Sequence, residues 1–111
     1  MNWIYLTNIG QLNHIRELSK TRPQVIFKHS TRCFISTVIK DRLERHAPPD
    51  ETDFYFLDLI RYRLISKSIA SEFSVHHESP QILLIRNGEC VYDESHNGID
   101  MVEIAAQVSH K

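Results

Sequence analysis

The order of strand and helix signals along this chain predicts an α/β domain with a mixed central sheet of about five strands flanked by four helices. Short runs of β-branched and aromatic residues alternate with stretches in which apolar residues recur every three or four positions, a pattern typical of alternating strands and helices. Near the carboxyl end, Asn87-Gly88 separates two strand-like runs, and this dipeptide favours a hairpin between antiparallel strands. The chain has 111 residues, so we expect residues 1–111 to form a single domain.

The first helix is expected after a short apolar strand at residues 3–6. Asn8 is a suitable N-cap for it, and Gln11 three residues later completes a capping box. The apolar positions of this helix recur at every third residue, so we expect them to face the core. They are Ile9, Leu12, Ile15 and Leu18.

The second helix is expected to run from about Cys33 to about residue 46, between strands at residues 24–28 and 53–58. A Pro-Pro pair closes it, because proline cannot continue a helix. The third strand is apolar at nearly every position, which favours a place inside the sheet. The spacing of the apolar residues predicts that the buried face of the helix consists of Ile35, Val38, Ile39 and Leu43.

A third helix is expected to end near residues 75–77 and is followed by Ser79-Pro80 and a fourth strand at residues 81–85. After the hairpin turn, residues 89–93 are expected to return antiparallel as an edge strand. The apolar face of the third helix consists of Ile65, Ile69 and Phe73, and that of the last helix of Met101, Ile104, Ala105 and Val108.

This topology has a consequence for the position of a site. Right-handed crossovers make the second and third strands parallel, so both end at the same edge of the sheet. A fourth strand that runs antiparallel to them starts at that edge. Cys33, Asp58 and Ser79-Pro80 are therefore expected to lie together, although they are far apart in sequence.

Cys33 is the first candidate for chemistry, since it lies between an apolar strand and a helix. Backbone N–H groups at a helix N-terminus lack partners and carry the positive end of the dipole, which stabilises a thiolate. Arg32 adds a positive charge one residue away. Ser36 completes a Cys-x-x-Ser motif, which keeps an attacking thiol but cannot close a local disulfide. We expect a reactive, partly exposed thiol; the alternative is a buried, inert cysteine that begins a helix.

Four blocks of the sequence match a known family: residues 27–33 with Ile35-Ser36, Leu57-Asp58 with Arg63 and Ile65-Ser66, residues 77–81, and Asn87-Gly88 with Ser95-His96. These blocks resemble the monothiol bacilliredoxins of the YtxJ type, a family of the thioredoxin-like superfamily. The resemblance implies a thioredoxin-like fold and a cytoplasmic thiol–disulfide oxidoreductase that removes bacillithiol from S-bacillithiolated proteins through Cys33. Neither the Trp-Cys-Gly-Pro-Cys segment of ordinary thioredoxins nor the Cys-Gly-Phe-Ser segment of iron–sulfur glutaredoxins is present.

The resemblance also implies the partners and one further part of the site. Bacillithiol, or another low-molecular-weight thiol, is the expected co-substrate, and S-thiolated proteins are the expected clients, with no tightly bound cofactor. Pro80 matches the proline that precedes the fourth strand in the thioredoxin fold. The Ser79–Pro80 bond is therefore expected to be cis, so that the Ser79 backbone contacts the substrate chain.

Several neighbouring residues allow two interpretations. Arg32 is either a partner of the thiolate or a solvated loop charge. Thr31, with Ser30, is expected to cap the helix. Ser36 either donates a hydrogen bond to the Cys33 sulfur or bonds back to its own helix.

Residues farther along the chain are also open to two interpretations. Arg61 and Arg63 follow Asp58 and either meet the carboxylates of a small thiol or are simply solvated. His29 either tunes the site or is a hydrogen-bonded structural residue. Cys90 lies beyond the hairpin turn, away from the active edge, and a structural role is expected for it.

The composition excludes some classes of function. A formal net charge of −1 with 24% charged residues argues against nucleic acid or an anionic membrane surface as the partner. Two cysteines do not make a disulfide framework, and the seven histidines lack the spacing of zinc ligands, so we expect no metal. The first residues lack the features of a signal peptide, and a reducing cytoplasm is expected. Three alternatives to the bacilliredoxin remain: a glutathione-type monothiol redoxin, a non-enzymatic redox sensor or adaptor, and an inert binding module.

Overall fold

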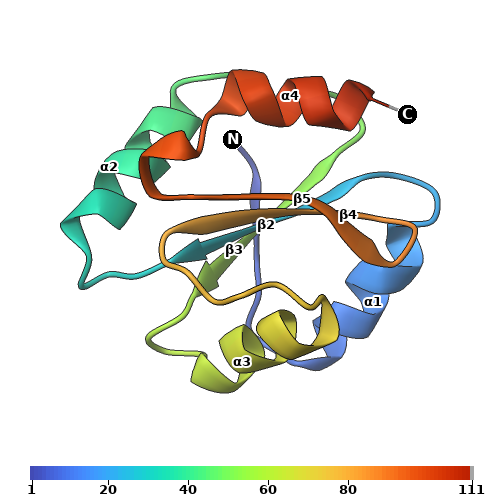
Figure 1. The fold of residues 1–111 in the computed structure, drawn as a ribbon, viewed down its shortest axis with the longest axis horizontal. Helices are drawn as coiled ribbons and strands as arrows, with labels where there is room; N and C mark the ends of the chain where they lie inside the picture. The colour runs from blue at the N-terminus through green and yellow to red at the C-terminus, as the bar shows by residue number, and fades with distance from the viewer. Residues whose placement is uncertain (111) are drawn as a thin grey trace.

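The computed structural model describes residues 1–110, which form five strands and four α-helices (Figure 1). None of the helices in this range is long and apolar enough to cross a bilayer. The strands are β1 (Trp3–Tyr5), β2 (Gln24–His29), β3 (Asp53–Asp58), β4 (Gln81–Arg86) and β5 (Glu89–Ser95). The helices are α1 (Gly10–Leu18), α2 (Phe34–Glu44), α3 (Arg63–Glu72) and α4 (Met101–Ser109), with a short 3-10 helix, η1 (His96–Gly98), before α4.

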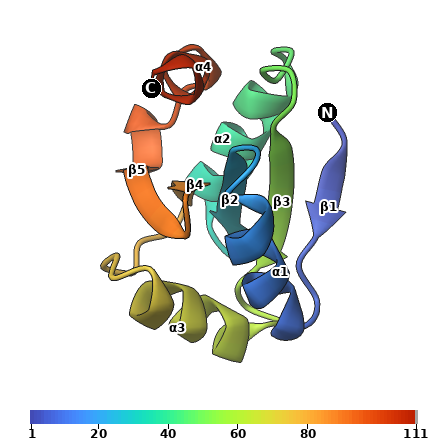
Figure 2. The ribbon, with the colours of Figure 1, turned by 90° about the vertical axis from the view of Figure 1, so that its right-hand side faces the viewer.

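The strands form one mixed sheet in the order β1-β3-β2-β4-β5, which can be followed across Figure 2 from β1 on the right to β5 on the left. β1, β3 and β2 are parallel, and β4 and β5 are antiparallel to their neighbours. β2 is central and buried at every position. The predicted mixed sheet is confirmed, with β3 inside it and β5 at an edge. At the hairpin, Asn87 and Gly88 both have positive φ angles, 54° and 79°, as the favoured two-residue turn requires.

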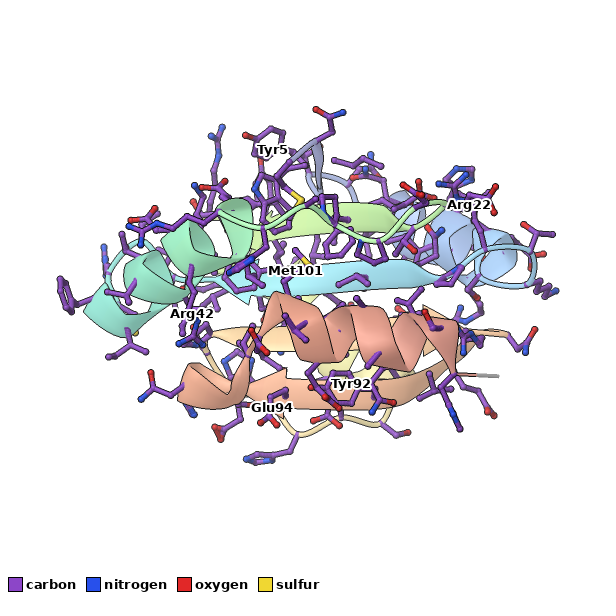
Figure 3. The ribbon with its side chains drawn as sticks, turned by 90° about the horizontal axis from the view of Figure 1, so that it is seen from above. Tyr5, Arg22, Arg42, Tyr92, Glu94 and Met101 are labelled. Carbon is purple, nitrogen blue, oxygen red and sulfur yellow. The ribbon has the colours of Figure 1, made fainter. Side chains whose placement is uncertain are left out.

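Two helices cover each face of the sheet: α2 and α4 lie on one side and α1 and α3 on the other (Figure 1). Because side chains alternate along a strand, each strand contributes to both cores. Ile26 and Leu57 pack with Ile65 and Ile69 of α3. On the other face, Figure 3 shows Arg42 extending from α2 toward the segment before α4, where its guanidinium donates to the carbonyl groups of Asn97 and Ile99.

The start of α1 differs slightly from the prediction. The Gln11 side chain accepts from the Asn8 N–H at 3.0 Å, as in a capping box, but the Asn8 side chain accepts from the Gly10 N–H at 2.7 Å and not from that of Gln11. The N-cap position itself is Ile9, and the Ile9 side chain is 52% exposed. Its assignment to the buried stripe was wrong, because a residue at the helix entry lies outside the packed turn.

The buried face of α2 also differs from the prediction. Ile39 and Leu43 are buried, but Ile35 and Val38 are 39% and 42% exposed, and Ser36 is fully buried in their place. The helix is rotated so that Ser36 faces the sheet, where its hydroxyl is hydrogen-bonded. The apolar side chains next to Cys33 consequently remain at the surface, and the helix ends at Glu44, two residues earlier than expected.

The register of the strands confirms the expected meeting point. His29 at the end of β2 pairs with Asp58 at the end of β3, and Lys28 pairs with Gln81 at the start of β4. The Leu59 N–H donates to the His29 carbonyl at 3.0 Å, so the chain after β3 stays beside β2. Segments that follow β2 and β3 and precede β4 therefore share one edge of the sheet.

Candidate active site

Cys33 is the N-cap residue of α2, with extended backbone angles of φ −113° and ψ 114°. Its N–H donates to the Ser30 carbonyl at 3.2 Å, and its carbonyl accepts from the Thr37 N–H at 3.3 Å. The side chain is half-buried and carries a free thiol. The expected placement, a partly exposed thiol at a helix N-terminus, is confirmed.

The loop before Cys33 corrects one expectation. Thr31 and Ser30 were expected to cap α2, but the N-cap position is Cys33 itself. The Ser30 hydroxyl instead accepts from the Arg32 N–H at 3.3 Å and so stabilises the turn that leads to the cysteine. The side chains of Thr31 and Arg32 are exposed.

Ser36 links the helix to the end of β2. Its hydroxyl oxygen accepts from the Ser30 N–H at 3.1 Å and lies 2.7 Å from His29 Nδ1. Both side chains are buried. These contacts differ from both earlier interpretations, a bond to the Cys33 sulfur and a bond to the helix carbonyls. Ser36 holds the turn between β2 and α2 through two partners outside its own helix.

His29 is buried against aromatic side chains, with its ring centroid 5.2 Å from that of Phe56 and 6.0 Å from that of Phe27. Burial, together with the positive charge of Lys40, lowers the pKa of His29, and Asp58 opposes this change. The imidazole is therefore uncharged at neutral pH, and its Nδ1 can accept a hydrogen bond from the Ser36 hydroxyl. Of the two interpretations of His29, the structure favours the hydrogen-bonded structural residue.

The segment before β4 contains a cis Ser79–Pro80 bond, as predicted. Pro80 is buried, and its carbonyl accepts from the His96 N–H at 3.0 Å. Gln81 follows it and fastens the preceding loop: its side chain donates to the His76 carbonyl at 2.9 Å and accepts from the Glu78 N–H at 3.4 Å.

Arg61 and Arg63 both line a cavity of about 420 Å³, and each of them also lines a neighbouring cavity. Arg61 lines a cavity of about 360 Å³ with Asp58, and its guanidinium carbon lies 5.4 Å from the centroid of the Tyr62 ring. Arg63 lines a cavity of about 380 Å³ beside α3. Both side chains are exposed and close to the edge at which β2 and β3 end.

Cys90 lies at the opposite end of the sheet, paired with Ile85 near the hairpin turn. It packs against the core under α1 and α3, and its thiol donates to the Tyr92 carbonyl at 3.3 Å. Burial raises the pKa of Cys90 to about 11. The thiol is therefore protonated at neutral pH, which supports the expected structural role.

The sequence interpretation missed Lys28. Its side chain is fully buried in the central strand, and its ammonium has no hydrogen-bond partner within residues 1–110. Burial lowers the pKa of Lys28 to about 8, although the negative charge of Glu78 opposes the change. The sequence did contain a signal for Lys28: this lysine directly follows three apolar residues in a strand that was expected to be buried.

The fold and the site together define a thioredoxin-fold protein with one thiol at the start of α2. A thioredoxin-fold structure provisionally assigned as an oxidoreductase has 31% identity and a TM-score of 0.79, and the alignment covers 96% of this chain and 93% of that one. Thioredoxin from Malassezia sympodialis has 18% identity and a TM-score of 0.74, covering 97% and 89%. Thioredoxin from Fasciola hepatica has 20% identity and a TM-score of 0.71, covering 95% and 98%. The two thioredoxins show the fold alone.

A narrower assignment comes from the family comparison. The family model of the monothiol bacilliredoxin BrxC matches residues 4–104. The chain therefore belongs to the monothiol bacilliredoxin family, as the resemblance predicted, and this membership implies a thiol redox function.

Proposed function

We propose that this protein removes bacillithiol from S-bacillithiolated proteins by monothiol exchange at Cys33. The observation that carries the proposal is the position of the thiol: Cys33 is half-buried at the N-cap of α2, and the residue at the usual place of a second cysteine is a buried serine. Family membership adds the thiol redox chemistry. The other cysteine lies at the far end of the sheet, so the reaction uses a single thiol.

The Cys33 thiolate attacks the bacillithiol sulfur of the mixed disulfide. A bond forms between the Cys33 sulfur and the bacillithiol sulfur, while the bond between that sulfur and the client cysteine breaks. The client cysteine leaves as a thiolate and takes a proton from water. The number of disulfides is unchanged in this step, because Cys33 becomes the new mixed disulfide.

A second step regenerates the protein. Ser36 cannot act as a resolving thiol, so a second molecule of the small thiol, or another redoxin, attacks the bacillithiol sulfur and releases Cys33. With the small thiol as reductant, the product is its symmetric disulfide. A cytoplasmic location fits this requirement, because both cysteines are free thiols and the reductant is abundant only in a reducing compartment.

The other candidate residues receive supporting roles in this proposal. Arg32 contributes positive charge beside the thiolate, and Arg61 and Arg63 are candidates to bind the carboxylates of the small thiol. Ser79, beside Pro80, offers its backbone to the client chain in a strand-like contact. Thr31 belongs to the turn that presents Cys33.

The proposal is tested by comparing two cysteine variants on an S-bacillithiolated reporter protein. Cys33→Ser is expected to lower the rate of thiol release by about 1,000-fold or more, since it removes the nucleophile. Cys90→Ser is expected to retain most of the rate, because Cys90 is half-buried and lies far from the active edge. Equal losses in the two variants would establish a two-cysteine mechanism and contradict the monothiol proposal.

The same assay separates the alternatives. A glutathione-type redoxin would release glutathione from an S-glutathionylated reporter faster than bacillithiol from its counterpart. A redox sensor or adaptor would form a mixed disulfide at Cys33 once, without turnover, and an inert binding module would form none. We expect turnover with the bacillithiol substrate.

A further inference from the structure

A cavity of about 380 Å³ lies beside α3, on the face of the sheet opposite α2. Its lining combines an apolar part with a basic part. The apolar residues are Leu59, Ile60 and Ala70, and the basic residues are Arg63, Lys67 and His77. Among residues 1–110 no carboxylate lines the cavity, so Arg63 and Lys67 are available to a negatively charged ligand.

Lys28 adds a buried positive charge under the same part of the fold. It lies two residues after Ile26 and pairs with Leu57, so its side chain is on the sheet face that α3 covers. It is 0% exposed, and its Nζ lacks a hydrogen-bond partner in the described part of the chain. The charge of Lys28 acts on a residue that lines the cavity: the pKa of His77 is lowered first by burial and then by Lys28.

The negative charge of Glu78 compensates the Lys28 ammonium only in part. Glu78 attracts Lys28 electrostatically, but no ion pair between them is formed within residues 1–110. Ser79, the residue after Glu78, contributes a second buried polar atom, Oγ, that has no hydrogen-bond partner within residues 1–110. A buried polar group without a hydrogen-bond partner destabilises the folded protein, and its retention calls for a functional explanation.

We propose that this cavity binds a small organic acid, whose apolar body contacts Leu59, Ile60 and Ala70 and whose carboxylate meets Arg63 and Lys67. Arg63 is the side chain best suited to a direct contact, because a guanidinium matches a carboxylate in a bidentate manner. Lys28 contributes its charge from the buried sheet face that α3 covers, where the low dielectric of the interior strengthens its field. His77 belongs to the loop that leads to Ser79-Pro80, so an occupied cavity stabilises that loop.

This site goes beyond the proposed exchange reaction and shares only Arg63 with it, which is also a candidate to bind a carboxylate of the small thiol. Cys33 begins α2 on the other face of the sheet, and none of the cavity-lining residues is a thiol. Binding is therefore expected in Cys33→Ser as well as in the unaltered protein. Failure of the exchange reaction and failure of this site are separate results.

The experiment is a titration with benzoate, followed by calorimetry and by the backbone amide shifts of residues 59–70 and 77. We expect saturable binding in the unaltered protein and in Cys33→Ser. Arg63→Gln and Lys28→Met are each expected to weaken binding about tenfold, because each removes one positive charge from the site. Lys20→Met serves as the control, since Lys20 is exposed and pairs with Glu17 elsewhere on the surface.

Two further probes test the chemistry of the ligand. Benzamide has the shape of benzoate without its charge, and inorganic phosphate has charge without an apolar body. Benzoate binding that is tighter than both supports the assignment. Benzamide binding as tightly as benzoate, phosphate binding more tightly, shifts spread over the whole surface, or equal effects of Lys20→Met and Lys28→Met would each overturn it.

Discussion

Lys28 is a charged side chain at the centre of the sheet, and its burial is expected to reduce the stability of the fold. The pKa of Lys28 is lowered from 10.5 to about 8, mainly by burial. At about 1.4 kcal/mol for each pH unit, this corresponds to roughly 3 kcal/mol against the charged, folded form. A residue that reduces stability in this way is consistent with the binding role proposed for it.

Lys28→Met should therefore raise the free energy of unfolding at pH 7 by about 1–3 kcal/mol, since an apolar side chain of similar size replaces a buried charge. Urea denaturation measures the change. The gain should shrink as the pH rises from about 8 to 10.5, because in that range the unfolded lysine holds a proton that the folded one has lost, so the unaltered protein becomes more stable with pH. Lys20→Met, at an exposed position, should stay within about 0.5 kcal/mol of the unaltered protein. A destabilised Lys28→Met would show that the ammonium has stabilising partners.

His29 should make the free energy of unfolding depend on pH below neutrality. Its pKa in the folded protein is lowered, first by burial and then by Lys40. As the pH falls below about 6.5, the unfolded chain binds a proton at this residue before the folded protein does, so stability is lost. His29→Gln, which has no titrating group, should lose less stability between pH 7 and pH 5 in urea denaturation. His46→Gln, at an exposed position, is the matched control, and an equal effect of both variants would contradict the role of His29.

At the scale of single elements, periodicity predicted that helices exist but not how each one is rotated. The pattern in α2 contained enough apolar residues for a face that included Ile35 and Val38, but these two side chains are 39% and 42% exposed. The rotation instead follows from the hydrogen bonds of Ser36 to Ser30 and His29, which involve residues of another element. A spacing rule does not contain that information. Lys28 was missed for the same reason: the sequence shows a lysine in a strand, but not the absence of a partner around it.

The loop of residues 76–79 provides the element-scale prediction. The buried Gln81 side chain bonds to both His76 and Glu78, so it links β4 to the loop that precedes it. Gln81→Leu removes both contacts and should lower the free energy of unfolding by about 1–3 kcal/mol. It should also speed amide hydrogen exchange in residues 76–79, which mass spectrometry can follow.

The matched control for this variant is Gln24→Leu. Gln24 is equally buried but lies at the other end of the sheet, where its side chain bonds to Asp53 and Tyr55. Gln24→Leu should reduce stability to a similar extent and leave hydrogen exchange in residues 76–79 unchanged. If both variants speed hydrogen exchange in residues 76–79 equally, exchange there follows the stability of the whole protein and not the contacts of Gln81.

At the scale of the whole molecule, the site could be predicted because topology places it. Right-handed crossovers and one hairpin are enough to bring the ends of β2 and β3 and the start of β4 to one edge, and the register confirms this for His29, Asp58 and Gln81. The position of Cys33 follows from that arrangement. The contacts that hold the edge together depend on individual side-chain geometry, which the strand order does not specify.

The edge strand β1 provides a test of how cooperative the whole fold is. Trp3 in β1 is the only tryptophan, and its ring centroid lies 5.6 Å from those of Phe27 and Phe56. Its indole N–H also donates to the Glu44 carboxylate at 2.7 Å, at the end of α2. The fluorescence of Trp3 therefore reports on the edge strand, the central strands and one helix together.

Urea unfolding followed by Trp3 fluorescence should coincide with unfolding followed by far-ultraviolet circular dichroism. The reason is that β1 cannot leave the sheet without exposing the aromatic cluster that also contains Phe27 of the central strand, so loss of the edge and loss of the core are one transition. Glu44→Ala removes the indole acceptor and should shift both transitions together, by about 1 kcal/mol. A fluorescence transition at lower urea than the dichroism transition would show instead that β1 separates first, leaving a sheet of β3, β2, β4 and β5.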